Sequence, residues 1–209
     1  MSTSSTDGNM LPVMEEFYSL QGEGCYTGTA AYFIRIGGCD VGCEFCDSKA
    51  AWNAAHFAPT SIDDILHRLQ QFTTRTVVLT GGEPMLYNLD MLCDRLHAAG
   101  YRTHLETSGS HPISGNWDWI CLSPKQGSHV YEHFYRRAGE LKVIICHDDD
   151  FVRAEEEAAK VRQVNPDCRL LLQAEWSRRQ SLTPKVVNYI LQHPQWTLSQ
   201  QSHKYIHIR

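Results

Sequence analysis

Three cysteines that lie within eight residues of one another are the side chains whose spacing most directly indicates chemistry. Cys39, Cys43 and Cys46 form a C-x3-C-x2-C run, with Phe45 directly before the last cysteine. Cysteine thiolates hold iron–sulfur clusters, and a closed [4Fe–4S] cluster takes one thiolate for each of its irons. Three thiolates leave one iron with an open position. The run therefore predicts a cluster that binds a further ligand and takes part in a reaction.

A structural zinc site is the alternative for the same cysteines. Structural zinc usually has four ligands, from paired C-x2-C units or from C-x2-C with H-x3-H. A fourth ligand here would have to be Cys25 or His56, and neither lies at a standard spacing. A cluster that only transfers electrons would also need a fourth cysteine. The spacing favours the open cluster, and the roles of Cys25 and His56 stay undefined.

Several polar segments each follow an apolar run, where a strand would end. They are Thr80-Gly81-Gly82-Glu83-Pro84, Glu106–Ser110, Ser123-Pro124-Lys125 and Gln173-Ala174-Glu175-Trp176. Such segments often only begin loops, and Gly-Gly followed by Pro can be an ordinary turn. In α/β folds, however, ligands bind at the carboxyl ends of the strands. Hydroxyls with a carboxylate would suit a ribose, Lys125 a carboxylate group, and residues 173–176 an adenine.

A glutamine and a glutamate flank a glycine in Leu20-Gln21-Gly22-Glu23-Gly24. This segment is either a glycine turn between two strands or a reader of an N–H edge such as that of a pterin, because a carboxylate accepts paired N–H donors well. Arg35 lies in the apolar run 32–36, where strand alternation places it on the same face as Phe33. An arginine in so apolar a strand needs an anionic partner. We expect that partner to be an internal carboxylate or the carboxylate of a substrate.

Short apolar runs that alternate with amphipathic helical patterns must position these segments. We expect strands at 31–36, 76–80, 102–106, 119–122, 140–146, 169–173 and 196–199. Several are almost wholly apolar, which is typical of parallel strands buried on both faces. Helices are expected after the capping residue Ser61, at 89–100, from 148–150 to 161, and from Thr183-Pro184 onwards.

The alternation of strands and helices predicts an α/β fold. The connection from Leu122 to Glu140 has room for only a short or irregular helix, so fewer helices than strands fit. This count excludes a regular eightfold barrel, and we predict a partial barrel.

The composition is that of a globular protein. The chain has 209 residues, 42% of them hydrophobic and 21% charged, which is enough for one domain with a substantial core. We expect residues 1–10 to be a flexible tail and residues 11–209 to be a single domain. The net charge of −5 disfavours a nucleic-acid partner. No apolar stretch approaches the roughly 18 residues that span a bilayer, and the N-terminus lacks the basic and apolar regions of a secretory signal. We expect a cytoplasmic protein that binds neither membrane nor nucleic acid.

Eight cysteines in a chain of this size without an export signal are not expected to form disulfides. Cys93, Cys121 and Cys146 lie in apolar patterns, so we expect them to be buried thiols. Residues 201–209 alternate polar and apolar side chains, and we expect this end of the chain to be tucked against the domain.

The cysteine run, with an aromatic residue before its last cysteine, resembles the signature of the radical S-adenosylmethionine superfamily. Residues 80–84 resemble the superfamily segment whose backbone carbonyls contact the methionine ammonium group. The resemblance implies that Cys39, Cys43 and Cys46 hold a [4Fe–4S] cluster whose open iron chelates S-adenosylmethionine. The reduced cluster would cleave the sulfonium to a 5′-deoxyadenosyl radical, so the cofactor carries the chemistry. It also implies a partial (β/α)6-type barrel with reduced helix content.

Further segments resemble one family of this superfamily, 7-carboxy-7-deazaguanine synthase. They are Leu20–Gly24, Cys46-Asp47-Ser48, Ser123–Lys125, Glu140-Leu141-Lys142-Val143 and the Gln-x-His-Lys-Tyr segment at 201–205. The similarity runs from about Val13 to Arg209. Ser108 and Ala174 depart from the residues that are most usual in this family.

The resemblance assigns a role to individual residues. S-adenosylmethionine would be bound by Phe45, Cys46, Asp47, Gly82, Glu106, Ser123, Pro124, Lys125, Gln173, Ala174, Glu175 and Trp176. A pterin would be bound by Leu20, Gln21, Gly22, Glu23, Arg35, Thr80, His203 and Arg209, the last through the terminal carboxylate. The Ser48 hydroxyl would bind Mg²⁺, a hard cation that takes few protein oxygens. No catalytic side chain is implied.

The implied reaction is the radical-mediated ring contraction of 6-carboxy-5,6,7,8-tetrahydropterin to 7-carboxy-7-deazaguanine, with release of ammonia, in 7-deazapurine (queuosine) biosynthesis. A homodimer and a reducing partner such as flavodoxin or ferredoxin are implied as well. Two alternatives remain. One is a glycyl-radical-activating enzyme, which shares the cysteine run but acts on a protein. The other is a structural zinc or iron–sulfur module without enzyme activity.

Overall fold

Parallel strands form most of one mixed sheet. The structure is a computed structural model and describes residues 9–209. Within that range the sheet has nine strands in the order β3-β1-β2-β4-β5-β6-β7-β8-β9. The parallel strands are β2 (Ala30–Ile36), β4 (Thr76–Gly81), β5 (Arg102–Thr107), β6 (Trp119–Leu122), β7 (Glu140–Ile145), β8 (Arg169–Ala174) and β9 (Trp196–Ser199). Each expected strand is present, with ends that differ by at most one residue.

Two further strands extend the sheet beyond β2 and were not expected. β1 (Met10–Leu20) pairs antiparallel with β2, and β3 (Pro59–Ser61) pairs antiparallel with the start of β1. Because β3 and β9 are the outer strands, the barrel is not closed by hydrogen bonds. Since β1 starts at Met10, the expected tail of residues 1–10 reaches one residue too far. Residues 1–8 lie outside the described part of the chain.

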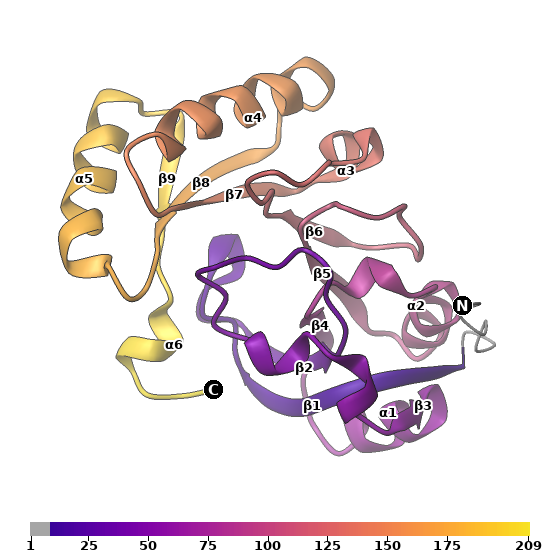
Figure 1. Ribbon diagram of the computed structural model, residues 1–209. Helices are drawn as coiled ribbons and strands as arrows, with labels where there is room; N and C mark the ends of the chain where they lie inside the picture. The colour runs from indigo at the N-terminus through magenta and orange to yellow at the C-terminus, as the bar shows by residue number, and fades with distance from the viewer. Residues whose placement is uncertain (1–8) are drawn as a thin grey trace.

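Helices surround the outside of the curved sheet (Figure 1). They are α1 (Ile62–Leu69), α2 (Asp90–Ala98), α3 (Glu132–Arg137), α4 (Asp150–Val164) and α5 (Arg179–Gln192). Short 3-10 turns occupy Gly24–Tyr26, Lys49–Ala51, Ala54–His56 and Pro84–Leu86. β5 and β6 are joined without a helix, and α3 between β6 and β7 is short. The α/β partial barrel with reduced helix content is therefore confirmed.

One expected helix start was wrong. α5 begins at Arg179, and Pro184 lies inside it rather than at its first turn. Its start is set by the Leu182 N–H, which donates to the Arg178 carbonyl at 3.0 Å. α4 begins at Asp150, within the expected start at 148–150, and ends at Val164 rather than at Val161. The Asp150 carboxylate accepts the Cys146 and His147 N–H groups at 2.7 and 2.8 Å and so holds the turn before the helix.

The parallel strands have two differently used faces. In β2, Tyr32, Ile34 and Ile36 belong to the main apolar core under the helices. Phe33 and Arg35 point to the inner side of the curved sheet and line a pocket there. This is the arrangement that alternation predicts for Arg35. The outer core holds the fold together, and the inner face carries polar side chains.

The scattered cysteines and the C-terminus fit their expectations only in part. Cys93 and Cys121 are buried, but Cys146 is half-buried because it lies one residue beyond the end of β7. The C-terminal segment forms α6 (Ser202–Tyr205). Its Tyr205 and Ile206 are 50% and 56% exposed, so apolar burial does not hold this segment in place.

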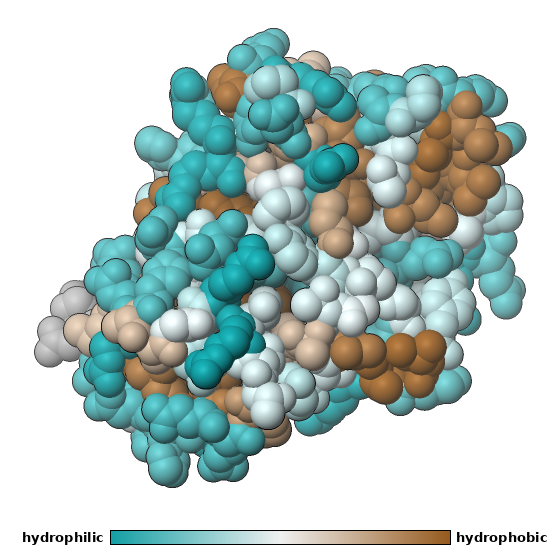
Figure 2. Space-filling model, turned by 180° about the vertical axis from the view of Figure 1, so that it is seen from behind, coloured by the Kyte–Doolittle hydropathy of each residue, from teal (hydrophilic) through white to brown (hydrophobic). Residues whose placement is uncertain are grey.

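The surface is mostly polar. The face shown in Figure 2 is largely hydrophilic, with separate hydrophobic patches. Exposed large apolar side chains include Val152 of α4 and Leu191 of α5. Within residues 9–209, no helix combines the length and the apolar character needed to cross a bilayer.

Candidate functional site

A cavity of about 810 Å³ opens at the carboxyl ends of the parallel strands, on the inner side of the sheet. This cavity is lined by all but one of the residues that we expected to bind the cluster, S-adenosylmethionine, Mg²⁺ or the pterin. They are Leu20, Gln21, Gly22, Glu23, Arg35, Cys39, Cys43, Phe45, Cys46, Asp47, Ser48, Thr80, Gly82, Glu106, Ser123, Lys125, Gln173, Ala174, Glu175, Trp176, His203 and Arg209. The exception is Pro124, whose carbonyl instead accepts a hydrogen bond from Arg153 at 3.3 Å.

The three cysteines lie on the loop that follows β2, and all of them line the cavity. The Cys46 N–H donates to the Cys43 carbonyl at 3.1 Å, and the Ser48 N–H donates to the Cys46 sulfur at 3.4 Å. Burial raises the pKa of the Cys39 and Cys43 thiols. A positively charged metal centre would counter this effect, because coordinating thiols lose their protons.

The donor set fits a cluster better than a single ion. Within residues 9–209, no three His, Cys, Asp or Glu side chains are grouped as ligands of one metal ion. A [4Fe–4S] cluster does not need such a group, since each thiolate binds a different iron. The residue at position 82 must be glycine for this segment to pack against the cysteine loop. A Cβ on Gly82 would lie 2.0 Å from the Gly38 carbonyl oxygen. The segment Gly81–Pro84 therefore packs directly against the cysteine loop.

Glu83 joins this glycine segment to the end of β5. Its side chain is almost fully buried, and its carboxylate accepts hydrogen bonds from the Thr107 hydroxyl at 2.5 Å and from the Met85 N–H at 3.1 Å. The Ser108 N–H and hydroxyl donate to its other oxygen at 2.8 and 2.5 Å. One buried carboxylate thus fixes the ends of two neighbouring strands beside the cysteines.

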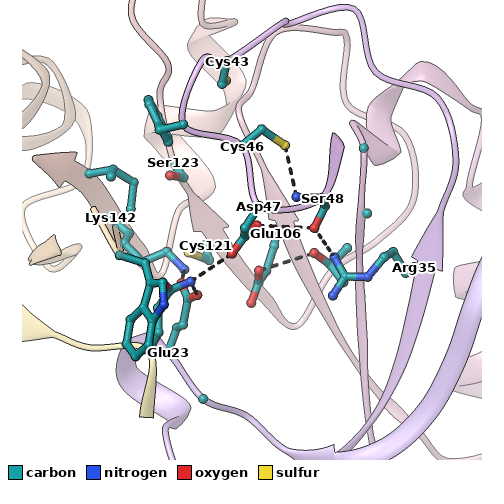
Figure 3. A pocket seen from close by; sticks show the side chains of 18 of the residues that line it. Glu23, Arg35, Cys43, Cys46, Asp47, Ser48, Glu106, Cys121, Ser123 and Lys142 are labelled. Atoms are coloured by element: carbon teal, nitrogen blue, oxygen red, sulfur yellow. Dashed lines mark hydrogen bonds and ion pairs between the residues drawn. The ribbon is translucent and has the colours of Figure 1, made fainter. Parts of the chain in front are cut away.

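Arg35 links β1, β2 and the end of the cysteine loop (Figure 3). Its Nε donates to Glu15 at 2.8 Å, and its terminal nitrogen donates to the Ser48 hydroxyl at 3.0 Å. The Ser48 hydroxyl donates in turn to Asp47 at 3.3 Å. The internal carboxylate expected for Arg35 is therefore Glu15, its cross-strand neighbour. The guanidinium still faces the cavity and can bind an anion as well.

A second polar group surrounds Glu23. Lys142 of β7 forms a buried ion pair with it. The side-chain amides of Gln173 and Gln201 donate to the two Glu23 oxygens at 3.1 and 2.7 Å. Glu23 is therefore held from three directions by groups on β7, β8 and the segment before α6.

Glu106 lies with residues expected to bind the substrate. It accepts a hydrogen bond from the Gln21 amide at 2.8 Å, and the Thr80 hydroxyl lies 3.4 Å from its other oxygen. Lys125 lies apart from this group and donates to the Ser123 carbonyl and hydroxyl at 2.9 and 2.6 Å. Burial lowers the pKa of Lys125. The geometry thus separates a Gln21–Thr80–Glu106 cluster from the Ser123–Lys125 segment.

The C-terminal segment covers one side of the cavity. The Ser202 N–H donates to the Gly22 carbonyl at 2.8 Å, and His203 packs so closely on Gly22 that a Cβ there would lie 2.0 Å from the imidazole. Lys204 pairs with Asp47 at 2.8 Å. The Arg209 carbonyl accepts the Ser19 hydroxyl at 2.7 Å. Polar contacts of Ser202, Lys204 and Arg209 hold this segment, with His203, at the pocket.

Four pocket residues with a clear role in this network were not expected: Glu15, Lys142, Gln201 and Lys204. Lys142 carries a signal that alternation could have found, because it lies between the core residues Leu141 and Val143 of β7, as Arg35 does in β2. Glu15 carries no such signal, since nothing in a partly exposed strand marks which carboxylate meets Arg35.

Comparisons with known proteins agree with this geometry. The family model described as the radical SAM superfamily matches residues 33–140. A 7-carboxy-7-deazaguanine synthase from Flavobacterium psychrophilum is 51% identical over 201 residues, which cover 96% of this chain and 94% of that protein. The protein of the same name from a Synechocystis strain is 46% identical, with 95% and 93% covered.

A solved structure is similar along the whole fold. The crystal structure of QueE from Escherichia coli superimposes with a TM-score of 0.82 at 30% identity, and the match covers 97% of this chain and 100% of that one. The similarity therefore extends over almost the whole of this chain.

Proposed function

This chain belongs to the 7-carboxy-7-deazaguanine synthase family of the radical S-adenosylmethionine superfamily, and we propose that the cavity described above is where it carries out the reaction of that family. It is a radical S-adenosylmethionine lyase that contracts the ring of 6-carboxy-5,6,7,8-tetrahydropterin to give 7-carboxy-7-deazaguanine and ammonia. The observation that carries the proposal is the convergence of the cysteine loop, the strand-end segments and the C-terminal segment on one cavity.

The cysteine loop and the strand ends form the cofactor side of the cavity. Cys39, Cys43 and Cys46 would hold a [4Fe–4S] cluster. Gly82 lets the glycine segment lie against the loop that carries these cysteines. Phe45, Asp47, Ser123, Lys125 and the residues 173–176 would hold S-adenosylmethionine. When bound, the cluster and S-adenosylmethionine supply the radical chemistry. Pro124 contributes through the backbone of its segment, since it does not line the cavity.

The residues around Arg35 and Glu23 form the substrate side. The Arg35 guanidinium and the neutral or charged imidazole of His203 would bind the carboxylate of the pterin. Gln21, Thr80 and Glu106, which already contact one another, would hold the heterocycle with Glu23. We therefore propose that Glu106 contacts the substrate rather than S-adenosylmethionine. The Arg209 terminal carboxylate would close the same side.

Both alternatives from the sequence lose their support. A glycyl-radical-activating enzyme acts on a protein, whereas the relatives that match almost the whole chain are named for a small-molecule product. A structural module without activity has no need for a large polar cavity beside its cysteines.

The direct test is an anaerobic assay of the reconstituted protein with S-adenosylmethionine, a reductant and 6-carboxy-5,6,7,8-tetrahydropterin. We expect 7-carboxy-7-deazaguanine, identified by mass, together with ammonia. A protein that has a full cluster and cleaves S-adenosylmethionine but forms no deazapurine would disprove the proposed function.

Magnesium is proposed to bind at Ser48. Its hydroxyl accepts one hydrogen bond from Arg35 and donates one to Asp47, which leaves one lone pair for a cation. A hydroxyl and carboxylate oxygens are the hard ligands that Mg²⁺ prefers, and the substrate carboxylate would complete the site.

Ser48→Ala is therefore expected to keep its cluster absorbance but to lose about tenfold in turnover, with a weaker response to added Mg²⁺, because one coordinating oxygen is missing. The measurement is turnover against Mg²⁺ concentration for both proteins. Identical Mg²⁺ curves would show that Ser48 is not a ligand.

We also propose an electron donor, an oligomeric state and a cellular location for this protein. Radical chemistry of this kind needs a one-electron reductant, and we propose a small redox protein such as flavodoxin or ferredoxin. The family resemblance suggests a homodimer, which sedimentation can test. We also propose a cytoplasmic location, which cell fractionation can test.

A further inference from the structure

Lys142 of β7 is a buried cation on the inner face of the sheet. Only 5% of its side chain is exposed, and its ammonium group donates to Glu23 in an ion pair. Figure 3 shows the two side chains at one end of the cavity, away from Arg35 and Ser48.

A buried ion pair is an expensive way to hold a fold together. Taking both charges out of water costs free energy that their attraction only partly returns, so apolar residues of similar size often serve stability equally well. The apolar neighbours of Lys142 in β7, Leu141 and Val143, already belong to the main core. A requirement of the site, rather than of the fold, explains why a lysine stands between them.

Glu23 is held as an acceptor with one free direction. Lys142 and the Gln173 amide donate to Oε2, and the Gln201 amide donates to Oε1. All three partners are donors, which suits an ionised carboxylate and not a protonated one. Glu23 also lines the cavity, so the one acceptor site that remains can accept an N–H group of a ligand.

We propose that Lys142 is a positioning residue that keeps Glu23 ionised and correctly oriented to accept an N–H donor of the pterin. This inference rests on the proposed function, because it takes the pterin as the ligand that Glu23 meets. Lys142 acts only through Glu23 and does not itself need to touch the substrate.

The charges around Glu23 explain why a cation is needed there. The titratable groups that face Lys142, besides Glu23, are Glu140 of the same strand, Glu106 of β5, Cys121 of β6 and Lys125 of the segment after β6. Glu23 also faces His203 of α6, and Lys204 and Asp47 lie near that imidazole. Burial alone raises the pKa of the Glu23 carboxyl. The charge of Lys142, with the hydrogen bonds from Lys142, Gln201 and Gln173, outweighs burial and lowers this pKa to about 2.

Removing Lys142 is expected to raise the pKa of Glu23. With Lys142 present, Glu23 stays ionised across the whole physiological pH range. Without it, burial, the largest single effect on this carboxyl, is opposed only by the weaker hydrogen bonds from Gln201 and Gln173, so the pKa of Glu23 rises above its usual value. A protonated Glu23 has lost an acceptor site, and pterin binding then weakens as the pH falls.

The test compares Lys142→Met with wild type in a binding experiment. Reconstituted protein loaded with S-adenosylmethionine, without reductant, is titrated with 6-carboxy-5,6,7,8-tetrahydropterin by calorimetry between about pH 6 and about pH 9, the range in which a raised carboxyl pKa is detected. The ratio of the variant Kd to the wild-type Kd removes the titration of the pterin itself. We expect this ratio to be at least about tenfold larger at the acid end than at the alkaline end.

Two control variants separate charge from packing. Lys142→Arg keeps a permanent cation and should give a ratio that does not change with pH. Lys160→Met removes the lysine of an exposed pair with Glu157 on α4, where the Lys160 side chain is 53% exposed, and should bind the pterin as wild type does. A Lys142→Met ratio that is raised equally at every pH would mean a merely structural role and would overturn the inference.

A double variant covers the case in which Lys142→Met does not fold. Glu23→Gln/Lys142→Met removes both charges of the Glu23–Lys142 pair, and the inference expects pH-independent binding that is at least about tenfold weaker than wild type. Binding as tight as wild type would overturn it. Wild-type protein that binds the pterin but does not convert it would contradict the proposed function instead, so the two failures are distinguishable.

Discussion

Replacing Arg35 with glutamine is expected to lower kcat/KM for 6-carboxy-5,6,7,8-tetrahydropterin by about a hundredfold to a thousandfold. Removing one partner of a hydrogen-bonded, largely buried charge pair costs about 2–5 kcal/mol, and each 1.4 kcal/mol is about tenfold. Arg35 pairs with Glu15 at 2.8 Å, holds the Ser48 hydroxyl at 3.0 Å and faces the cavity. Its loss therefore removes the cation for the substrate carboxylate and leaves Glu15 facing the cavity without its nearest partner.

A matched control is the ion pair that Glu16 of β1 forms outside the cavity. Arg68 of α1 pairs with Glu16, the residue next to Glu15, but neither residue lines the cavity. Arg68→Gln removes an arginine from a similar pair and should leave kcat/KM within about threefold of wild type, because this pair lies outside the site. Initial rates against pterin concentration give the comparison. Equal small losses in both variants would contradict the role given to Arg35.

Replacing Glu83 with alanine is expected to lower the free energy of unfolding by about 3–5 kcal/mol, the cost typical of breaking a buried polar network. The carboxylate accepts the Met85 and Ser108 N–H groups and two hydroxyls, and the side chain is only 2% exposed. Alanine leaves both backbone N–H groups buried without an acceptor, and each unsatisfied group costs about 1–3 kcal/mol.

Glu83→Gln keeps the shape of the side chain but replaces one of its two acceptor oxygens with an NH₂ donor. The two backbone N–H groups donate to different oxygens of Glu83, at 3.1 and 2.8 Å. Glutamine has a single oxygen, so one of these N–H groups must face the amide NH₂, and the hydroxyls can turn but cannot correct this. We expect an intermediate loss, measured by urea denaturation of cluster-free protein followed by circular dichroism.

The control for Glu83 is an exposed glutamate. Glu132 pairs with Arg136 within α3, and its side chain is 68% exposed. Glu132→Ala should change the free energy of unfolding by less than about 0.5 kcal/mol. A Glu83→Ala protein as stable as Glu132→Ala would mean that the strand ends are held by other contacts.

The parallel strands could be predicted because their residues are unusual. A strand buried on both sides of a sheet is almost wholly apolar, and runs such as Leu170–Leu172 are recognisable without any tertiary information. β1 could not be found in this way, since it carries Glu15, Glu16 and Ser19 and is only partly buried. Glu15 faces the cavity and Glu16 faces α1, so polar residues point to both faces of the strand. The sequence of β1 therefore does not alternate between polar and apolar residues.

The site was predicted unevenly for a related reason. Cysteine spacing and strand-end motifs are local in sequence, so they identified the cluster loop and most of the cavity. The ion pairs that organise the cavity are not local. Glu23 and Lys142 are separated by 119 positions, and Lys204 and Asp47 by 157. Which carboxylate meets which cation depends on how the sheet curves.

The sequence by itself determined the type of chemistry, because three thiols in one short loop leave a cluster open wherever the rest of the chain goes. It also determined the parallel strands, since burial on both faces demands apolar residues. Only the tertiary structure decided that Glu106 lies with Gln21 and Thr80. It also decided that Pro124 is not part of the cavity lining and that α6 is held by polar contacts. The physical reason is that hydrogen bonds and ion pairs depend on distance in space, which a linear pattern does not contain.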